Sequence, residues 1–307
     1  MKLTRHLKVL LFAAALLAPV AARSQTAPQR AQAEAPVAAR VESVPFESKL
    51  VGAKLPYHVV LPPGYADAAN ARVSYSVLYL LHGLGGGADN WVSRRARLAE
   101  YTAQYRMIIV SPEGRDGWYT DGVAPNEKFE SYFVEELLPD VQKRFRTIEA
   151  REGRAVAGLS MGGYGALKFG LKYPDRFTFA ASMSGALAVA SWLPEMPVPA
   201  FVKPSVARVF GPAASPVRAA NDIYRIARET PAGRVASLPY FYLDCGTEDG
   251  LLSNNRDFAA LLVERKIPHE YRQLPGNHSW PYWDRQVREV LKIAAQRLAA
   301  PREVKAP

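Results

Sequence analysis

A serine flanked by glycines stands near the middle of the chain, where a strand-like run meets a helix-like run. The segment 158–162 has the sequence Gly-Leu-Ser-Met-Gly, with Ser160 at its centre. Residues 154–158 form a β-like run, and residues 162–173 have a helical pattern that ends at Pro174. A strand that turns sharply into a helix crowds its own backbone, so small residues are needed on both sides of the serine. The segment therefore predicts a buried strand, a helix packed behind it, and a serine hydroxyl raised above the edge of a sheet.

Apolar runs and helical patterns alternate along the rest of the chain. Strands are predicted at residues 75–81, 106–110, 154–158, 177–183, 239–245 and 269–274, after an antiparallel pair at 41–51 and 57–61. Helices are predicted from a cap at Asp89 through residue 105, at 128–145 with a kink at Pro139, and at 162–173, 253–266 and 284–298. The alternation predicts an α/β fold: a mostly parallel, twisted sheet with helices on both faces and N-terminal antiparallel strands.

One segment interrupts this alternation. Residues 191–236 contain many prolines and only a short helical stretch around 223–228. In mostly parallel sheets the ligand lies beyond the carboxyl ends of the strands. We therefore predict that 191–236 is an insertion over the active site, where specificity for acyl and alcohol groups would reside.

The first 40 residues are predicted to lie outside the folded domain. Residues 1–22 begin with basic side chains and continue into an apolar run at 9–20, which is typical of a secretory signal. A membrane span needs about 20 apolar residues, so a cleaved signal is favoured over an anchor. Residues 23–40 are rich in Ala, Gln and Pro and predict a disordered leader. The remainder, 41–300, suits a single domain exported to the periplasm or beyond, without stable membrane insertion after cleavage.

Composition excludes several classes of function. The 39 Lys and Arg residues exceed the 29 Asp and Glu residues, but both signs are spread along the chain, so no nucleic-acid partner is expected. Cys245 is the only cysteine and lies in an apolar run, which favours a buried structural thiol over a catalytic one. The sequence has no clustered His and Cys pair, so no metal or other cofactor is expected. The oligomeric state is left open.

A serine hydroxyl becomes an effective nucleophile when a histidine, itself oriented by a carboxylate, takes its proton. When the serine stands on such a turn, the chain order is Ser, then Asp or Glu, then His. His278 follows the predicted strand 269–274 and is the candidate base. Asp249 and Glu248 both follow the strand 239–245, and we favour Asp249 as the acid. Asp244 lies inside that strand, where its side chain is expected to point into the structure.

The same chemistry needs hydrogen-bond donors for the oxyanion. The backbone N–H of Met161, the residue after the serine, is one candidate. The other is expected in the glycine-rich segment 82–87, whose backbone can approach a substrate closely. Leu84 is our choice there, with Gly83 and Gly85 as alternatives. The segment lacks the ending and spacing of phosphate-binding loops.

Several longer motifs match one family of enzymes. They are Tyr57-His58-Val59-Val60-Leu61-Pro62-Pro63-Gly64-Tyr65, Leu81-His82-Gly83-Leu84-Gly85-Gly86, Gly117-Trp118-Tyr119-Thr120-Asp121, Glu130-Ser131-Tyr132, the segment around Ser160 from Ala157 to Ala166, and Gly276-Asn277-His278-Ser279-Trp280. Over about residues 41–298 the chain resembles the esterase D family of α/β-hydrolases. That family includes S-formylglutathione hydrolases, short-chain esterases, feruloyl esterases and mycolyltransferases. The resemblance implies a triad of Ser160, Asp249 and His278, oxyanion donors at Leu84 and Met161, and no cofactor.

These features predict an exported serine carboxylesterase for short-chain acyl or small aromatic esters. The alternatives are a feruloyl or acetyl esterase acting on plant cell-wall polysaccharide, and an acyltransferase of the mycolyltransferase type. A non-catalytic binding protein on the same fold is disfavoured because all three triad residues are present. S-formylglutathione hydrolase is less favoured, because those enzymes are cytosolic and often carry a cysteine near the site. Trp118, Tyr119 and Trp280 are predicted to bind substrate through their rings, with packing of the sheet edge as the alternative.

Overall fold

The computed structural model describes residues 39–93 and 97–303. The predicted signal at 1–22 lies outside these residues, as does the predicted leader up to residue 38. No helix within the described ranges is both long enough and apolar enough to cross a membrane.

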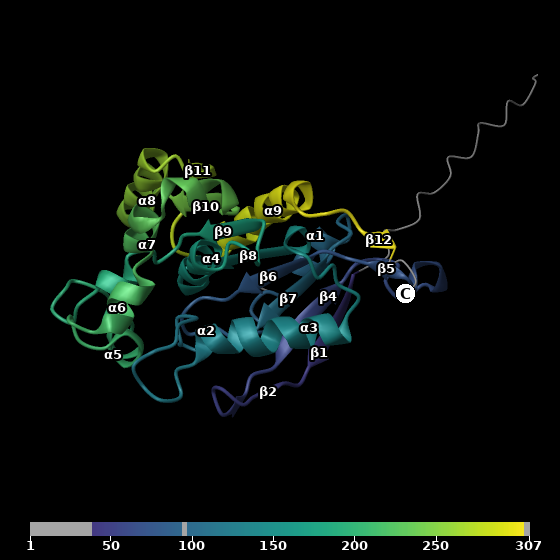
Figure 1. The fold of residues 1–307 in the computed structure, drawn as a ribbon, viewed down its shortest axis with the longest axis horizontal. Coiled ribbons are helices and arrows are strands. Elements are labelled where there is room, and N and C mark those ends of the chain that lie inside the picture. The colour runs from purple at the N-terminus through teal and green to yellow at the C-terminus, as the bar shows by residue number, and fades with distance from the viewer. Residues whose placement is uncertain (1–38, 94–96, 304–307) are drawn as a thin grey trace, which may run out of the picture. The chain divides into compact units, whose positions relative to one another are not determined.

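A single eight-stranded sheet forms the centre of the fold (Figure 1). In spatial order its strands are β1 (Arg40–Val44), β4 (Tyr57–Leu61), β7 (Ile108–Pro112), β6 (Val77–Leu81), β8 (Arg154–Leu159), β9 (Phe179–Met183), β10 (Tyr240–Gly246) and β11 (His269–Leu274). The pairs β1–β4 and β4–β7 are antiparallel, and the remaining neighbours are parallel. The predicted mostly parallel sheet with N-terminal antiparallel strands is therefore confirmed.

Helices cover both faces of this sheet. The α-helices of the described residues are α1 (Leu98–Thr102), α2 (Phe129–Ser131), α3 (Leu138–Arg144), α4 (Met161–Lys172), α5 (Lys203–Phe210), α6 (Pro216–Asn221), α7 (Ile223–Glu229), α8 (Leu252–Glu264) and α9 (Trp280–Arg297). Side chains alternate along β6: Tyr79 packs in the core shared with α4, whereas Leu78 packs in the core shared with α9. This alternation explains why β6 is apolar throughout, since each of its faces is buried.

Two helix predictions are corrected. No helix begins at Asp89: residues 88–92 form turns, and α1 begins only at Leu98. Burial of Trp91, whose Nε1 donates to the Leu81 carbonyl at 3.1 Å, holds these turns against the sheet. The predicted helix 128–145 is helical, but its middle is the π-helical segment Tyr132–Leu137. Pro139 is the second residue of α3, which begins where that wider segment ends, and a missing N–H is tolerated there.

The predicted insertion contains more helix than expected. It forms α5, α6 and α7, which lie together on the left of Figure 1, rather than one short helix. The buried guanidinium of Arg218 closes this segment by donating to the carbonyl oxygens of Ala190, Trp192 and Gly211. One cation thus satisfies backbone acceptors that a loop of this kind would otherwise leave unpaired.

A buried ion pair ties α4 to the chain around it. The Lys168 Nζ on α4 lies 2.8 Å from Glu130 and also donates to the Tyr119 carbonyl and the Thr120 hydroxyl. Burial lowers the pKa of Lys168 to about 8, although Glu130 acts against the shift. Breaking such a pair by removing one partner is costly, because the other charge remains buried.

A second buried carboxyl, Asp244 on β10, forms no ion pair with the described residues, although Arg272 is its register partner on β11. Its Oδ1 accepts a hydrogen bond of 2.9 Å from the Tyr282 hydroxyl on α9, and its Oδ2 has no partner within the described part of the chain. Burial raises the pKa of Asp244 from 3.8 to about 7, and the hydrogen bond from Tyr282 offsets only part of that shift. The prediction that this side chain points into the structure is confirmed.

We expect Asp244→Asn to change how stability depends on pH. The folded-state pKa of Asp244 is raised, so its protonated form stabilises the fold at pH 4, and this contribution is lost as the pH rises through about 7. Asn mimics the protonated carboxyl. The variant should therefore gain stability relative to wild type between pH 4 and pH 8, by on the order of a few kcal/mol. Urea unfolding at both pH values measures this gain.

The exposed Asp175, whose side chain is 75% accessible, provides the matched control as Asp175→Asn. The control should show no comparable pH-dependent gain. A difference between Asp244→Asn and wild type that stays constant with pH would contradict the assignment.

Candidate active site

Ser160 occupies the turn between β8 and α4, and its backbone is strained. Its φ of 54° and ψ of −116° lie outside the helical and strand regions. A Cβ added to Gly162 would lie 2.6 Å from the carbonyl oxygens of both Leu81 and His82. A Cβ on Gly158 would lie 2.4 Å from the backbone of Gly162. Because backbone atoms cannot move aside as a flexible side chain can, both positions require glycine.

The structure brings Ser160, His278 and Asp249 into one hydrogen-bonded chain. The His278 Nε2 lies 3.0 Å from the Ser160 Oγ, and its Nδ1 lies 2.9 Å from Oδ2 of Asp249. The three residues come from the ends of β8, β11 and β10, which meet at one edge of the sheet. This arrangement suits transfer of the serine proton to the imidazole, with the carboxylate holding Nδ1–H.

Asp249 is held as a carboxylate. Its side chain is buried, which alone would raise its pKa. The contact with His278 and the N–H of Leu251, which donates to Oδ1 at 2.9 Å, outweigh burial and place the pKa of Asp249 below its ordinary value. The alternative acid, Glu248, instead accepts hydrogen bonds from the Thr247 hydroxyl and the N–H of Gly276. Glu248 therefore fastens the loop that carries His278 and does not reach the imidazole.

Backbone N–H groups surround the serine. Met161 is the first residue of α4, and its N–H finds no acceptor among the described residues, as expected in a first helical turn. The segment 82–87 approaches closely, since a Cβ on Gly83 would lie 3.3 Å from the Cβ of Ser160. The N–H of Gly85 is already bonded to Asp116 Oδ1 at 2.7 Å, which removes Gly85 as a donor. Leu84 and Gly83 stay as candidates beside Met161.

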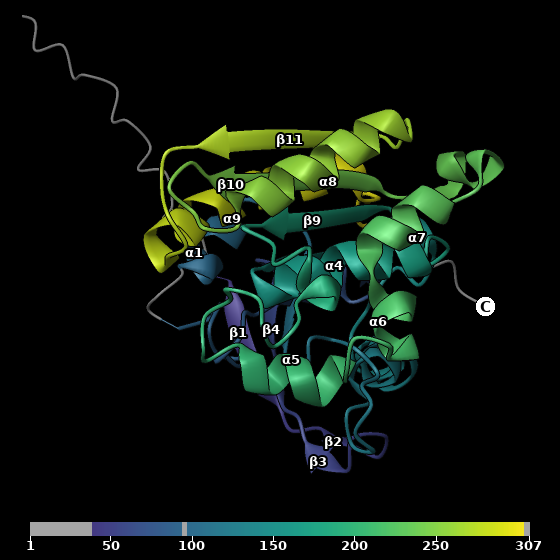
Figure 2. The same ribbon diagram turned by 90° about the vertical axis from the view of Figure 1, so that its left-hand side faces the viewer.

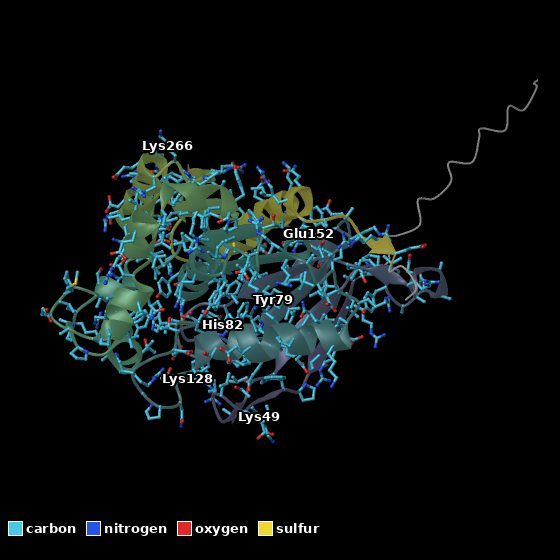
Figure 3. The ribbon with its side chains drawn as sticks, viewed as in Figure 1. Lys49, Tyr79, His82, Lys128, Glu152 and Lys266 are labelled. Atoms are coloured by element: carbon cyan, nitrogen blue, oxygen red, sulfur yellow. The ribbon has the colours of Figure 1, made fainter. Side chains whose placement is uncertain are left out.

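Residues that the sequence analysis did not single out hold this oxyanion loop, residues 82–87. His82, which lies deep in the molecule (Figure 3), places Nδ1 2.8 Å from the Gly83 carbonyl, while its Nε2 accepts from the N–H of Gly114 at 2.9 Å. We assign Nδ1 as the protonated nitrogen, because Nε2 faces a donor. The bond to the Gly83 carbonyl fixes the peptide that carries the Leu84 N–H.

Glu113 and Asp116 support the same loop from the segment after β7. Glu113 accepts hydrogen bonds from the N–H groups of Arg115 at 2.6 Å and Ala88 at 3.2 Å. Burial would raise the pKa of Glu113, but the hydrogen bonds that its carboxylate accepts from these N–H groups help to lower it below the ordinary value. Glu113 and Asp116 both follow β7, the strand next to β6, and that position is the sequence signal that could have identified them.

The expected substrate-facing roles of Trp118 and Tyr119 are wrong. Each residue is 1% exposed. The Trp118 ring packs against Trp192, Tyr164 and Phe210 at centroid distances of 6.2 Å. The Tyr119 hydroxyl donates to the His82 carbonyl at 3.2 Å. Both rings serve packing, the alternative considered above.

Trp280 is the first residue of α9. It is partly buried, and its ring packs edge-on against Trp91 and Trp283. Its role in substrate binding stays a prediction. Trp283 in turn packs edge-on against the His278 ring at 4.9 Å, so this aromatic cluster borders the base.

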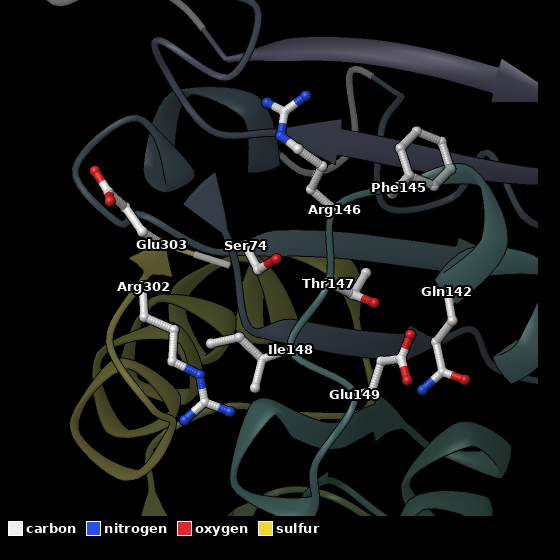
Figure 4. A pocket seen from close by; sticks show the side chains of 9 residues that line it. All are labelled: Ser74, Gln142, Phe145, Arg146, Thr147, Ile148, Glu149, Arg302 and Glu303. Atoms are coloured by element: carbon white, nitrogen blue, oxygen red, sulfur yellow. The ribbon is translucent and has the colours of Figure 1, made fainter. Parts of the chain in front are cut away.

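Three further observations concern groups outside the triad. Among the described residues, no group of three His, Cys, Asp or Glu side chains is placed to hold a metal ion. Cys245 is buried in β10, and burial raises the pKa of its thiol to about 12. A cavity of about 640 Å³ (Figure 4) is lined by residues 145–149 and by Arg302, at the opposite edge of the sheet from Ser160. It therefore takes no part in this site.

Comparison with known proteins identifies the family. The family model described as "Putative esterase" matches residues 48–292. The chain belongs to this esterase family. An acetyl esterase of Caldicellulosiruptor saccharolyticus is 28% identical over 254 residues, covering 80% of this chain and 95% of that protein. An esterase of Mycobacterium tuberculosis is 31% identical over 253 residues, covering 76% of this chain and 54% of that protein.

A solved structure of a ferulic acid esterase superimposes on this esterase with a TM-score of 0.73 and 28% identity, covering 85% of this chain and 99% of that one. The predicted membership of the esterase D group and the α/β-hydrolase fold are thereby confirmed. This esterase is an enzyme of the serine hydrolase class.

We expect Glu113→Gln to lower kcat for p-nitrophenyl acetate about tenfold, which is ~1.4 kcal/mol of transition-state stabilisation. The amide of Gln would turn its NH2 group toward one of the two N–H groups that now donate to Glu113. That hydrogen bond would be lost, and the loop that presents Leu84 would shift. KM should change little, because the oxyanion forms only during reaction. Steady-state kinetics measure both parameters.

Glu100→Gln is the matched control, because the side chain of Glu100 is 64% exposed on α1. Circular dichroism establishes that both variants fold. A folded Glu113→Gln variant with the wild-type kcat would show that Glu113 does not position the oxyanion loop.

Proposed function

We propose that this protein is an exported serine carboxylesterase that hydrolyses short-chain acyl or small aromatic esters. The observation that carries the proposal is the hydrogen-bonded chain from Asp249 through His278 to Ser160. Export is supported by the composition of residues 1–22 alone.

The geometry supports a two-step reaction. The Ser160 Oγ attacks the ester carbonyl carbon while His278 Nε2 takes the hydroxyl proton, and Asp249 stabilises the imidazolium through Nδ1–H. The carbonyl oxygen becomes an oxyanion and accepts hydrogen bonds from the Met161 and Leu84 N–H groups. Collapse of this intermediate breaks the bond to the alcohol oxygen, which receives the proton from His278. An acyl-enzyme on Ser160 remains.

Water then completes the reaction. It attacks the acyl carbonyl while His278 takes one of its protons, and a second tetrahedral oxyanion forms in the same place. Its collapse breaks the bond to the Ser160 Oγ, which regains the proton from His278. The carboxylic acid leaves and the enzyme is restored.

Several classes of ester are compatible with the same triad. Relatives of this chain include an acetyl esterase, a feruloyl esterase and a mycolyltransferase. An acetyl or feruloyl ester on plant polysaccharide, or acyl transfer to a sugar acceptor, would use the same triad. S-formylglutathione hydrolysis is disfavoured, because those enzymes are cytosolic and often carry a cysteine near the site, whereas Cys245 is buried in β10.

We expect Ser160→Ala to lower kcat for p-nitrophenyl acetate and butyrate by at least about 1,000-fold. The variant should also lose covalent labelling by a fluorophosphonate probe, because the nucleophilic oxygen is gone. Ser191→Ala, at an exposed serine of the insertion, should keep both properties. Wild-type turnover or labelling in Ser160→Ala would refute the proposed nucleophile.

A substrate panel distinguishes the alternatives. Methyl ferulate, acetylated xylan and tributyrin compare aromatic, polysaccharide-linked and short-chain lipid esters. Product analysis in the presence of a sugar acceptor detects transfer. A new sugar ester formed in preference to free acid would replace hydrolysis with acyl transfer as the function.

A further inference from the structure

The loop that carries His278 spans residues 275–279, between β11 and α9, and we call it the base loop. It approaches the end of β10 so closely that a Cβ added to Gly246 would collide with the carbonyl group of Gly276. Gly276 itself has a φ of 142°, in the region that favours glycine. The base loop therefore rests directly on the end of β10, the strand that leads into the loop with Asp249.

Tyr282, on the first turn of α9, contacts the base loop from the other side. A Cβ added to Gly276 would lie 2.6 Å from Cδ2 of the Tyr282 ring, so the ring packs directly on the backbone of that glycine. The N–H of Tyr282 donates to the Ser279 carbonyl at 3.1 Å, which closes the turn that follows His278. Tyr282 thus contacts the base loop both before and after the histidine.

The hydroxyl of Tyr282 is fixed to β10. It donates to Oδ1 of Asp244 at 2.9 Å, and both side chains are buried. Figure 2 shows β11, β10 and β9 in this order at the top of the fold, and the chain that leaves the arrowhead of β11 turns back into α9. Asp249 lies in the loop that follows β10. The hydrogen bond therefore ties the base loop to the strand that positions the acid of the triad.

The residue after Tyr282 contacts the base itself. The Trp283 ring packs edge-on against the His278 ring, with their centroids 4.9 Å apart. Both rings project from the same helical turn, so a movement of Tyr282 displaces Trp283 as well. The His278 Nε2 lies 3.0 Å from the Ser160 Oγ, and proton transfer over this distance is sensitive to small displacements of the base.

The hydroxyl adds something that ring packing alone does not supply. A phenylalanine at position 282 would bury the same ring, but Oδ1 of Asp244 would lose its donor. Oδ2 of Asp244 already has no partner within the described part of the chain. Because a buried polar group without a hydrogen bond is costly, the two side chains hold each other in one arrangement.

We propose that the hydrogen bond between Asp244 and Tyr282 positions the general base: it holds the base loop so that His278 stays aligned between Asp249 and Ser160. This inference rests on the proposed esterase function, because it assigns how the base of that reaction is oriented. Asp244 and Tyr282 are positioning residues that act through the base loop, and neither is assigned a contact with the substrate.

The test uses Tyr282→Phe, which keeps the ring against Gly276 and removes the hydroxyl. We expect kcat for p-nitrophenyl acetate to fall about five- to tenfold, because a displaced His278 takes the Ser160 proton less effectively. KM should stay within about twofold of wild type, since His278 serves both steps of the reaction and the substrate contacts are unchanged. The rate of covalent labelling by a fluorophosphonate probe should fall by the same factor as kcat.

Substitutions at Asp244 identify the hydrogen bond as the cause. Asp244→Leu removes the acceptor and should lower kcat as Tyr282→Phe does. Asp244→Asn keeps an oxygen that accepts from the Tyr282 hydroxyl, and it should retain the wild-type kcat. The double variant Asp244→Leu/Tyr282→Phe should lose no more activity than either single variant, because both remove the same contact. Should Asp244→Leu fail to fold, the comparison of Tyr282→Phe with Asp244→Asn decides.

Tyr57→Phe is the matched control. The buried Tyr57 donates its hydroxyl to Oδ2 of Asp140 on α3 at 2.7 Å, and β4 lies near the opposite border of the sheet from β11. This variant loses the same kind of hydrogen bond and should lose similar stability in urea unfolding. It should nevertheless keep the wild-type kcat and labelling rate, which separates an effect on the base from a general loss of stability.

Three results would each overturn the positioning role. They are a folded Tyr282→Phe variant with the wild-type kcat and labelling rate, an equal fall in kcat in Tyr57→Phe, and an Asp244→Asn variant that loses as much activity as Tyr282→Phe. In each case turnover of p-nitrophenyl acetate by wild type upholds the esterase function. A wild type that turns over no ester overturns the proposed function and this inference with it.

Discussion

The close approach of the Gly162 backbone to the carbonyl oxygens of Leu81 and His82 is the contact on which the rest of the site depends. It sets α4 directly against the end of β6, and so brings the N–H of Met161 and the loop with Leu84 to the same point. The strained backbone of Ser160 is the consequence, because no relaxed conformation joins β8 to a helix this close to its neighbour. The packing of β6 and α4 against the two cores supplies the energy that maintains this strain.

The segment after β7 connects three parts of the molecule. Through Glu113 and Asp116 it holds the oxyanion loop, and through Trp118 it supports the insertion, since the Trp118 Nε1 donates to the Ser205 hydroxyl on α5 at 3.0 Å. Thr120, two residues after Trp118, accepts a hydrogen bond from the buried Lys168 on α4. A change in the insertion can therefore reach the oxyanion loop through hydrogen-bonded and packed groups, without passing through the triad.

Buried ionisable groups behave differently according to their partners. The Glu130 carboxylate sits between Lys168 and Lys172, which outweigh the effect of burial and lower its pKa to about 2. Asp244 forms no ion pair with the described residues, and the hydrogen bond from Tyr282 together with the charge of Arg272 does not offset burial, which raises its pKa. The same physical cost, removal of a charge from water, thus leaves one carboxyl ionised at neutral pH and moves the pKa of the other to about 7.

The sequence alone determined those features that depend on local chemistry and chain order. Glycines beside Ser160 specified the sharp turn from strand to helix, and continuous apolar runs specified buried strands. The order Ser160, Asp249, His278 specified which loops had to meet. Tertiary structure decided the rest. The choice between Asp249 and Glu248 depended on which carboxylate reaches His278, and residues adjacent in sequence do not reveal that. Trp118 and Tyr119 follow a strand as ligand-binding residues often do, yet the insertion and α4 bury them, because packing partners distant in the chain decide which faces stay open.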